Sequence, residues 1–483
     1  MTAPTEGVGT GSLELSPERM LELADLASRL VVERLSALDG EPAWRGGSRS
    51  DLEALLREAA PEEGRPAEDV IRRAAHEILP VAGRVDHPRF FAFVPSSPTW
   101  PGVLADYMAA GHNIFQGTWL GGAGPSQLEL VVLDWFRDWI GYPDTAGGLF
   151  TSGGSAASLD AFVAAREHAG APDRATVYMS DQSHTALIRA ATIVGIRPAH
   201  VRMVPTDGHF RLDTAELGRM VEEDRRAGFT PVAVCANAGA TNTGAVDPID
   251  AVADFCEEHD IWLHVDAAYG GFAVLTEKGK AVLRGMERAD SIAMDAHKWL
   301  FQPFETGCLM VKDVRRLESA FTVHPEYLQD TRWGTEHPNF GDRGLQLSRS
   351  FRALKVWMSI QTFGVAAFRE AIAKGIDLAY QAEGYVRASE VLQIANPASL
   401  GVVCFRVHPK GSDLDEGSLE RINEVVQARV IETGIAMMSS TRLRGLYSLR
   451  LCILNHNTDW EDVERTLAAI ERFGEDEIAR SSG

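Results

Sequence analysis

The chain has 483 residues, of which 45% are hydrophobic and 24% charged, as in ordinary soluble globular proteins. This length suits two or three domains with a large buried core, and the composition excludes collagen-like, disordered and disulfide-scaffold proteins. With 47 basic and 68 acidic residues the formal net charge is -21. So acidic a protein is expected to bind neither nucleic acid nor an anionic membrane surface.

The N-terminus and the cysteines favour a cytoplasmic protein. The opening residues, MTAPTEGVGTGS, contain neither the basic segment nor the apolar stretch of a secretory signal. No apolar run approaches the roughly 18 residues of a membrane span. The five cysteines are scattered without zinc-site or redox spacing, so we expect reduced, mostly buried thiols. His87, His324 and His337 lack paired ligand spacing as well, and no metal site is expected.

A helix is predicted near the N-terminus. Ser16 followed by Pro17 and Glu18 is a helix start, and apolar residues then recur at helical spacing from Leu23 to Leu35. Such an apolar stripe needs a surface to cover it, and a partner chain would provide one. We assign residues 1–85 to an N-terminal helical segment.

From about residue 146, short apolar runs alternate with longer amphipathic segments. The runs are continuous rather than alternating, as in strands covered on both faces. The predicted strands are GGLFTS, TVYMS, HVRMV, PVAVCAN, IWLHVDAA, SIAMDA and GCLMVK. The predicted covering helices are SAASLDAFVAAREHA, SHTALIRAATIVG, DTAELGRMVEEDRRAG and PIDAVADFCEEH. This rhythm predicts an α/β domain with a mostly parallel sheet, which we place at residues 86–365.

The pattern changes after about residue 365. A long helix over roughly 366–395 leads to VVCFRV, a helix near 417–433, LYSLRLCIL and a final helix from about 459. This order predicts a smaller C-terminal α+β domain over residues 366–483.

Polar residues follow several of the predicted strands. The loop Thr151–Ser155 opens a helix and could cradle a phosphate, although alone it is as well explained by a tight turn. His184, Asp266 and Lys298 follow three later strands. Each has an ordinary explanation when taken singly, as a histidine near a cap, a loop-capping carboxylate and a surface lysine. Ligands gather at the carboxyl ends of parallel strands, so the combination matters more than any single residue.

These four features in this order are what pyridoxal phosphate requires. A lysine forms the Schiff base, and a carboxylate keeps the pyridine nitrogen protonated so that the ring draws electrons from Cα. A flat side chain stacks on the ring and a helix N-terminus holds the phosphate. The sequence therefore predicts a pyridoxal 5'-phosphate enzyme.

The motifs SDQSH, HVDAAYGG and DAHKWL resemble the group II pyridoxal-phosphate decarboxylases, the family of aromatic-L-amino-acid and glutamate decarboxylases. The resemblance is dense over residues 87–357 and continues more weakly to the C-terminus. It implies an aspartate-aminotransferase-type fold (fold type I) and a homodimer with active sites at the interface. The N-terminal helical segment would then wrap around the partner subunit.

The resemblance also assigns roles near the cofactor ring. Lys298 matches the Schiff-base lysine, and Asp266 matches the carboxylate at the pyridine nitrogen. Ala268 matches a residue packed under the ring. His184 matches the stacking histidine, which also lies near the substrate carboxylate, and His297 matches the histidine beside the lysine.

Other matched positions surround the phosphate. Gly154 and Ser155 match phosphate-loop positions, and Thr241 in ANAGATNTGAVDP matches a threonine near the cofactor. Asp295 stands where some relatives have asparagine, and its phosphate contact is the least certain of these matches.

Three residues match the walls of the side-chain pocket in relatives with aromatic substrates: Phe93, Pro95 and Phe115. Val94 and Gly117 are smaller than the aromatic residues that some relatives carry, which suggests a roomier pocket. The pocket therefore favours an aromatic or bulky apolar L-amino acid, which is decarboxylated to the amine and carbon dioxide.

One position departs from the family pattern. An ungapped alignment of PNFGDRGLQLSRSFRALK places Phe340 where many relatives carry a loop tyrosine that protonates Cα. Phenylalanine has no acidic proton, and Tyr327, the nearest tyrosine, lies far upstream. In the family, phenylalanine at this position accompanies aldehyde synthases, so oxygen-dependent oxidative deamination to an aldehyde is the alternative activity.

Two further alternatives stay open. An aminotransferase of this fold would use a C-terminal arginine to hold the α-carboxylate, and Arg406 or Arg450 could serve. A non-catalytic protein on the same fold is the other, although all four chemical positions are intact. The sequence does not identify the amino acid, because discrimination by a methylene or hydroxyl depends on pocket shape.

Overall fold

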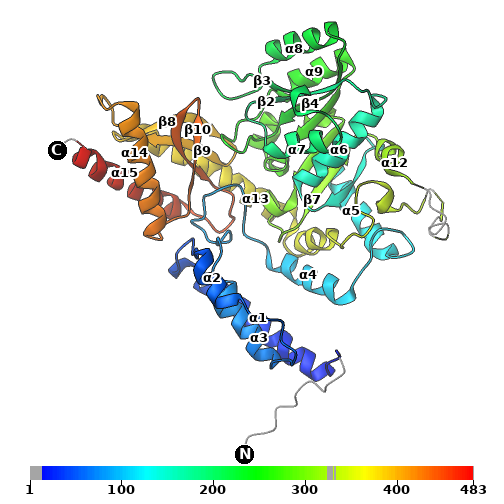
Figure 1. Ribbon diagram of the computed structural model, residues 1–483, viewed down its shortest axis with the longest axis horizontal. Coiled ribbons are helices and arrows are strands. Elements are labelled where there is room, and N and C mark those ends of the chain that lie inside the picture. The colour runs from blue at the N-terminus through cyan, green and yellow to red at the C-terminus, as the bar shows by residue number, and fades with distance from the viewer. Residues whose placement is uncertain (1–12, 324–329, 331–332, 335, 482–483) are drawn as a thin grey trace, which may run out of the picture.

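The structure is a computed structural model that describes residues 13–323, 330, 333–334 and 336–481 (Figure 1). Its N-terminal helices project from the body as an arm made of α1 (Pro17–Ala37), α2 (Arg49–Leu56) and α3 (Ala67–Arg73). As predicted, α1 begins after Ser16, whose hydroxyl accepts a hydrogen bond from the Arg19 amide. No residue of α1 is buried, so this helix has an uncovered apolar side.

A seven-stranded sheet forms the centre of the molecule. Its strand order is β1-β7-β6-β5-β4-β2-β3, and β7 alone runs antiparallel to its neighbours. The strands are β1 (Gly147–Thr151), β2 (Ala175–Ser180), β3 (Val201–Val204), β4 (Thr230–Asn237), β5 (Trp262–Asp266), β6 (Ser291–Asp295) and β7 (Gly307–Val311). All seven coincide with predicted runs, and most of their residues are buried, which explains the lack of alternation. The predicted α/β class is confirmed.

Helices pack on this sheet in the predicted alternation. The helix α6 contacts β4 to β7, α9 contacts β4 and β5, and α8 contacts β3 and β4. The helices of this region are α4 (Trp100–His112), α5 (Ala123–Ile140), α6 (Gly154–His168), α7 (Thr185–Ile193), α8 (Thr214–Arg226), α9 (Ile249–His259), α10 (Glu277–Val282), α11 (Ala296–Trp299) and α12 (Arg315–Phe321).

The C-terminal part forms a second layer with its own core. A four-stranded antiparallel sheet has the order β10-β11-β9-β8. Its strands are β8 (Leu392–Ser399), β9 (Val402–Val407), β10 (Ser439–Leu443) and β11 (Leu446–Cys452), and its helices are α14 (Glu416–Glu432) and α15 (Trp460–Ser481). Phe91 belongs to this second hydrophobic cluster although it lies far upstream in the sequence.

The helix α13 (Ala353–Ala388) joins the two sheets (Figure 1). Gly364 interrupts it with φ 74° and ψ 155°, a backbone conformation open to glycine. The long helix expected over about 366–395 therefore begins earlier and contains a kink, which lies next to the predicted domain boundary at 365.

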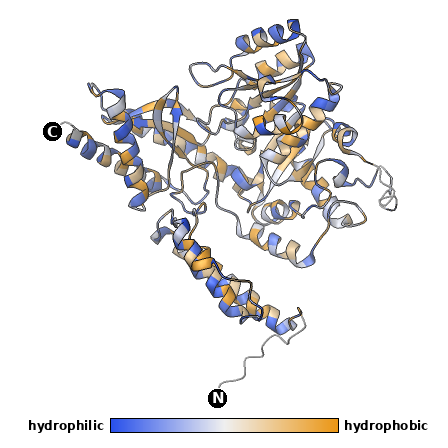
Figure 2. Cartoon of the chain, viewed as in Figure 1, coloured by the Kyte–Doolittle hydropathy of each residue, from blue (hydrophilic) through white to orange (hydrophobic). Residues whose placement is uncertain are grey.

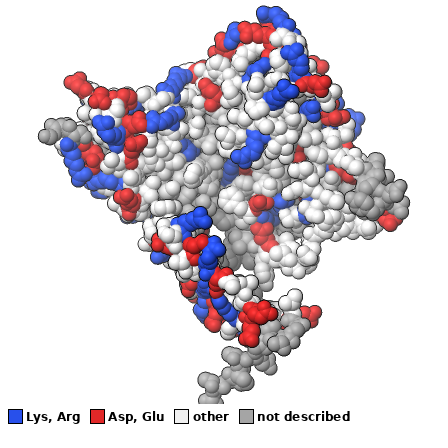
Figure 3. Space-filling model, viewed as in Figure 1, with Lys and Arg blue, Asp and Glu red and all other residues white. Residues whose placement is uncertain are grey.

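Other global features concern charge, membranes and metals. On the face seen in Figure 3, charged side chains gather over α8, over the C-terminal helices and along the arm. Among the described residues, no helix combines the length and apolar character needed to cross a bilayer. Within the same residues, no group of three or more His, Cys, Asp or Glu side chains is placed to hold a metal ion.

Candidate active site

The strand ends bring the predicted chemical residues to one edge of the large sheet. Asn237 at the end of β4 pairs with Asp266 at the end of β5, and Asp266 pairs with Ala293 of β6. The Asp295 amide donates to the Ala268 carbonyl oxygen (3.2 Å), which joins the DAHKWL and HVDAAYGG motifs. The carboxyl ends of parallel strands therefore create the site, as expected.

Lys298 lies on the short helix α11, directly after β6. Its Nζ forms an ion pair with Asp295 Oδ2 at 3.0 Å. Its carbonyl oxygen accepts a hydrogen bond from the Ser96 hydroxyl, a contact that no sequence motif predicts. His297 lies 3.6 Å from the same Asp295 oxygen, and burial lowers the pKa of its imidazole. Burial thus disfavours the charged form of His297, and Lys298 is the ion-pair partner of Asp295.

Asp266 ends β5, and its Oδ1 accepts a hydrogen bond from the Ala268 amide at 3.2 Å. Burial raises the pKa of the Asp266 carboxyl, while the positive charge of Lys298 and the backbone bond of Ala268 act in the opposite direction. A cation placed against this carboxylate would keep it ionised, since opposite charges interact strongly in a low-dielectric site.

His184 is the N-cap of α7, and its Nδ1 accepts from the Ala186 amide at 3.3 Å. Its side chain is otherwise exposed, which leaves the ring available to a ligand. The loops after β2 and β4 lie together, because Asn242 Nδ2 contacts Gln182 Oε1 at 3.4 Å. Thr241, half-buried in the second loop, is therefore brought to the same edge.

Gly153 and Gly154 form a cradle where α6 begins. A Cβ on Gly154 would lie 2.9 Å from Ala268 Cβ and 3.3 Å from Asp295 Oδ2. Gly307 of β7 is equally constrained, since its Cβ would lie 2.3 Å from Gly153 Cα. Ser155 is exposed in the first turn of α6. The cradle thus offers free backbone N–H groups and a hydroxyl to an anion.

The residues present fit pyridoxal phosphate. A carboxylate, a lysine, an exposed histidine ring and a helix N-terminus converge, and the buried Asp295 Oδ1 has no hydrogen-bond partner. An unpaired buried polar atom is costly, so a bound group is needed to satisfy it.

The three predicted pocket-wall residues lie on segments beside this edge. Phe93 has φ 57° and is 60% exposed, and Phe115 is 38% exposed. Pro95 is half-buried. Arg450 fixes this segment by donating from Nη2 to the Phe93 carbonyl oxygen (3.1 Å), another contact absent from the sequence prediction.

The expected extra room at Gly117 does not exist in this chain. A Cβ there would lie 2.0 Å from the Leu347 carbonyl oxygen and 2.6 Å from the tip of the Phe115 ring. Val94 is buried in the core. The small size of these residues serves close packing rather than an enlarged pocket.

Phe340 lies away from solvent, at 0% exposure, in the short 3-10 turn Phe340–Asp342. Its ring is flanked by the guanidinium groups of Arg343 and Arg349 at 5.2 and 4.8 Å. Phe340 thus has the surroundings of a core residue, and the aldehyde alternative that the alignment raised stays a prediction. Tyr327 and His324 lie outside the described residues.

Both candidate carboxylate-binding arginines have protein partners. Arg406 pairs with Glu416, and Arg450 donates to the Ser439 hydroxyl at 2.8 Å as well as to Phe93. Neither presents a free guanidinium face for an aminotransferase substrate.

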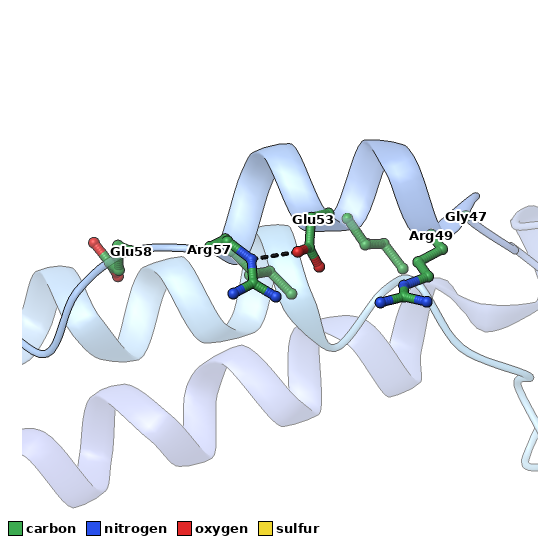
Figure 4. A pocket seen from close by; sticks show the side chains of 7 residues that line it. Gly47, Arg49, Glu53, Arg57 and Glu58 are labelled. Carbon is green, nitrogen blue, oxygen red and sulfur yellow. Dashed lines mark hydrogen bonds and ion pairs between the residues drawn. The ribbon is translucent and has the colours of Figure 1, made fainter.

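A separate hollow of about 570 Å³ lies on the arm (Figure 4). Arg57 and Glu53 form an ion pair across its wall. It is lined by Gly47, Arg49, Leu52, Glu53, Leu56, Arg57 and Glu58. It shares no residue with the Lys298 cluster and contributes nothing to that chemistry.

Comparison with known proteins agrees with this geometry. The family model described as "Pyridoxal-dependent decarboxylase conserved domain" matches residues 50–408. An aromatic-L-amino-acid decarboxylase of Bacillus atrophaeus is 39% identical over 469 residues, covering 96% of this chain and 97% of the relative. A phenylacetaldehyde synthase of Petunia hybrida is 33% identical over 435 residues, with 86% of each chain covered. A solved structure of Oryza sativa TDC with PLP and tryptamine has a TM-score of 0.91 at 28% identity, covering 96% of this chain and 99% of that one.

Proposed function

This chain belongs to the pyridoxal-dependent decarboxylase family, and we propose that it converts an aromatic L-amino acid to its amine and carbon dioxide at the Lys298 site. The observation that carries the proposal is the convergence of Lys298, Asp266 and the Gly154 cradle at one sheet edge. The enzyme is a carboxy-lyase with pyridoxal 5'-phosphate as its cofactor.

Each residue of the cluster has a part that follows from its position. The cofactor supplies a conjugated electron sink for the pair left on Cα when carbon dioxide departs. Lys298 Nζ would hold the cofactor, and Asp266 would hold a proton at the ring nitrogen. The Gly153–Gly154 backbone and Ser155 would hold the phosphate, with Thr241, Asp295 and His297 beside them.

The histidine and the pocket walls would orient the substrate. His184 presents an exposed ring at the mouth of the site, where it can stack on the cofactor and meet the substrate carboxylate. Phe93 and Phe115 offer exposed aromatic surface to a ring-bearing side chain. Holding the scissile bond in one orientation lowers the barrier because the reacting orbitals are aligned in advance.

The amine, rather than the aldehyde, is the product that the packing of Phe340 supports. The Phe340 ring is fully buried between the guanidinium groups of Arg343 and Arg349, which disfavours direct contact with a substrate. Aldehyde synthases are nevertheless among the relatives, so the two products need a direct test.

The test is a panel in which the holoenzyme receives each aromatic L-amino acid while amine, aldehyde, carbon dioxide and peroxide are measured together. We expect equal amounts of amine and carbon dioxide without peroxide. Phe340→Tyr should leave this ratio unchanged. Stoichiometric aldehyde and peroxide from the wild type would reject the amine as the product and favour the oxygen-dependent alternative.

We further infer that the enzyme acts as a homodimer in the cytoplasm. Apolar residues run along the arm (Figure 2), and α1 buries none of its residues. A second copy would cover this surface, as apolar patches of this kind mark subunit contacts. All five cysteines are buried and unpaired, which suits a reducing compartment.

A further inference from the structure

The carboxylate of Asp295 faces the glycine cradle. Its side chain is nearly buried, with 3% of the residue exposed, and its Oδ1 has no hydrogen-bond partner. A Cβ on Gly154 would lie 3.3 Å from Oδ2 and 3.7 Å from Oδ1, and one on Gly153 would lie 3.9 Å from Oδ1. The unpaired oxygen therefore lies against the N-terminal backbone of α6, where the cofactor phosphate is proposed to bind.

Few positive charges face this carboxylate. Lys298 Nζ is 3.0 Å from Oδ2, while burial lowers the pKa of His297 and leaves its ring uncharged at neutral pH. Burial raises the pKa of Asp266 on β5 and of Cys308 on β7, and the charge of Asp295 adds to both shifts. The first turn of α6 carries no acidic residue. Lys298 is thus the cation in direct contact with Asp295, while Arg349 and Lys355 act from farther away on its neighbours Cys308 and His297.

A bound phosphate changes this balance. A phosphate monoester with a second pKa of about 6 is largely a dianion at neutral pH. The backbone N–H groups of α6 attract it, but the neighbouring carboxylate repels it.

We propose that the cofactor phosphate binds together with one proton, held between a phosphate oxygen and Asp295 Oδ1. The proton comes from solvent, and no covalent bond forms or breaks. It turns a repulsive oxygen pair into a hydrogen bond and gives the unpaired Oδ1 a partner. This inference rests on the cofactor site proposed above and adds a proton linkage to it.

The linkage can be measured without catalysis. Pyridoxine 5'-phosphate carries an alcohol in place of the aldehyde, so it cannot bond covalently to Lys298. Calorimetric titration of the cofactor-free full-length chain, in buffers with different ionisation enthalpies, counts the protons taken up. At a pH of about 8 the wild type should take up about one proton more than Asp295→Asn.

The affinity for pyridoxine 5'-phosphate should also depend on pH more strongly in the wild type than in Asp295→Asn. For one linked proton, the affinity of the wild type falls by up to about tenfold per pH unit above neutrality. Asp295→Asn should bind pyridoxine 5'-phosphate about tenfold more tightly at that pH, since its amide donates a hydrogen bond where the carboxylate repels. Its affinity should also depend less on pH.

Two controls isolate the effect. Pyridoxine, which lacks the phosphate, should show no difference between the wild type and Asp295→Asn. Asp290→Asn changes a half-buried carboxylate just before the other end of β6. This carboxylate accepts a hydrogen bond from the Leu263 amide at 2.8 Å, and its replacement should leave the proton count unchanged.

Equal proton uptake by the wild type and Asp295→Asn would overturn the inference. If Asp295→Asn fails to fold, a wild-type affinity that stays constant with pH would do the same. No binding of pyridoxine 5'-phosphate to the wild type would overturn the inference together with the assigned cofactor site. Amine production assayed on the same preparation would show whether the decarboxylase function still stands.

Discussion

At the residue scale, Gly154 lies in the proposed cofactor cradle, where a side chain would have no room. In Gly154→Ala the new methyl group would lie 2.9 Å from Ala268 Cβ and 3.3 Å from Asp295 Oδ2, at the base of the cradle. We expect the dissociation constant for pyridoxal phosphate to rise about tenfold or more, because the methyl group occupies the approach to the backbone N–H groups. Absorbance titration of the cofactor-free protein measures this change.

Gly384→Ala is the matched control, since an exposed Cβ there would meet no atom within 4 Å. It should leave cofactor affinity unchanged and stabilise α13 by about 0.5–1 kcal/mol. Unchanged affinity in Gly154→Ala would show that the cradle does not hold the phosphate.

Asp160 gives the fold a pH dependence away from the lysine cluster. Burial raises the pKa of this carboxyl to about 7, and it accepts a hydrogen bond from the Leu345 amide at 3.2 Å. Between pH values of about 4 and 7 the folded state keeps the proton while the unfolded state releases it, so stability falls as pH rises. Asp160→Asn should remove this slope and raise the free energy of unfolding by about 1–2 kcal/mol at a pH of about 8.

Urea unfolding at several pH values measures the slope. Asp138→Asn, an exposed carboxylate paired with Arg137, should change stability by less than about 0.5 kcal/mol at every pH. An identical slope in the wild type and Asp160→Asn would assign the pH dependence to other groups.

At the scale of elements, a buried ion pair joins three segments that surround the site. Arg349 Nη2 lies 2.5 Å from Glu129 Oε1, and both side chains are 0% exposed. Glu129 also accepts from the Phe150 amide (2.8 Å) and from Gln116 Nε2 (2.7 Å). The pair therefore links α5, the strand before the cradle and the segment of the pocket wall that contains Phe115.

Glu129→Gln should destabilise the protein by about 3–5 kcal/mol, because it leaves the Arg349 guanidinium buried without a counter-charge. Denaturant unfolding measures the loss. Glu318→Gln, whose partner Arg343 is buried but whose own side chain is 41% exposed, should cost less than about 1 kcal/mol. A similar loss of unfolding free energy in both variants would contradict the larger contribution that we assign to the buried Glu129–Arg349 pair.

Helices and strands could be predicted from the sequence where a local pattern of apolar and polar residues was sufficient to define them. Continuous apolar runs identified the seven strands of the large sheet, and the polar residues that follow them identified Asp266, His184 and Lys298. The antiparallel direction of β7 could not be predicted from the sequence, because buried parallel and antiparallel strands both consist of continuous apolar residues. The packing of Phe340 and Gly117 was equally hidden, since it depends on Arg349 and Leu347 from a distant part of the fold.

At the scale of the whole molecule, the region around the C-terminal sheet is not built from C-terminal residues alone. Phe91 enters the second core, and its amide donates to the Met437 carbonyl oxygen at 2.7 Å. Two residues later, Arg450 of β11 holds the Phe93 carbonyl oxygen. The C-terminal sheet thus positions the segment of Phe93, which we propose as a wall of the substrate pocket, so damage to this sheet should affect substrate binding as well as stability.

The N-terminal arm has an exposed apolar surface, which we propose is covered by a second copy of the chain. Leu21 and Val32 of α1 are exposed, and the helix buries none of its residues. Replacing both with glutamate should weaken the dimer by at least about 100-fold, because each copy loses apolar contact area on both sides of the interface. Sedimentation should then report monomers with an unchanged circular dichroism spectrum, and decarboxylation should fall as the dimer dissociates. Glu33→Gln, an exposed polar change on the same helix, should remain dimeric and active. A wild type that sediments as a monomer with full activity would reject the proposed dimer.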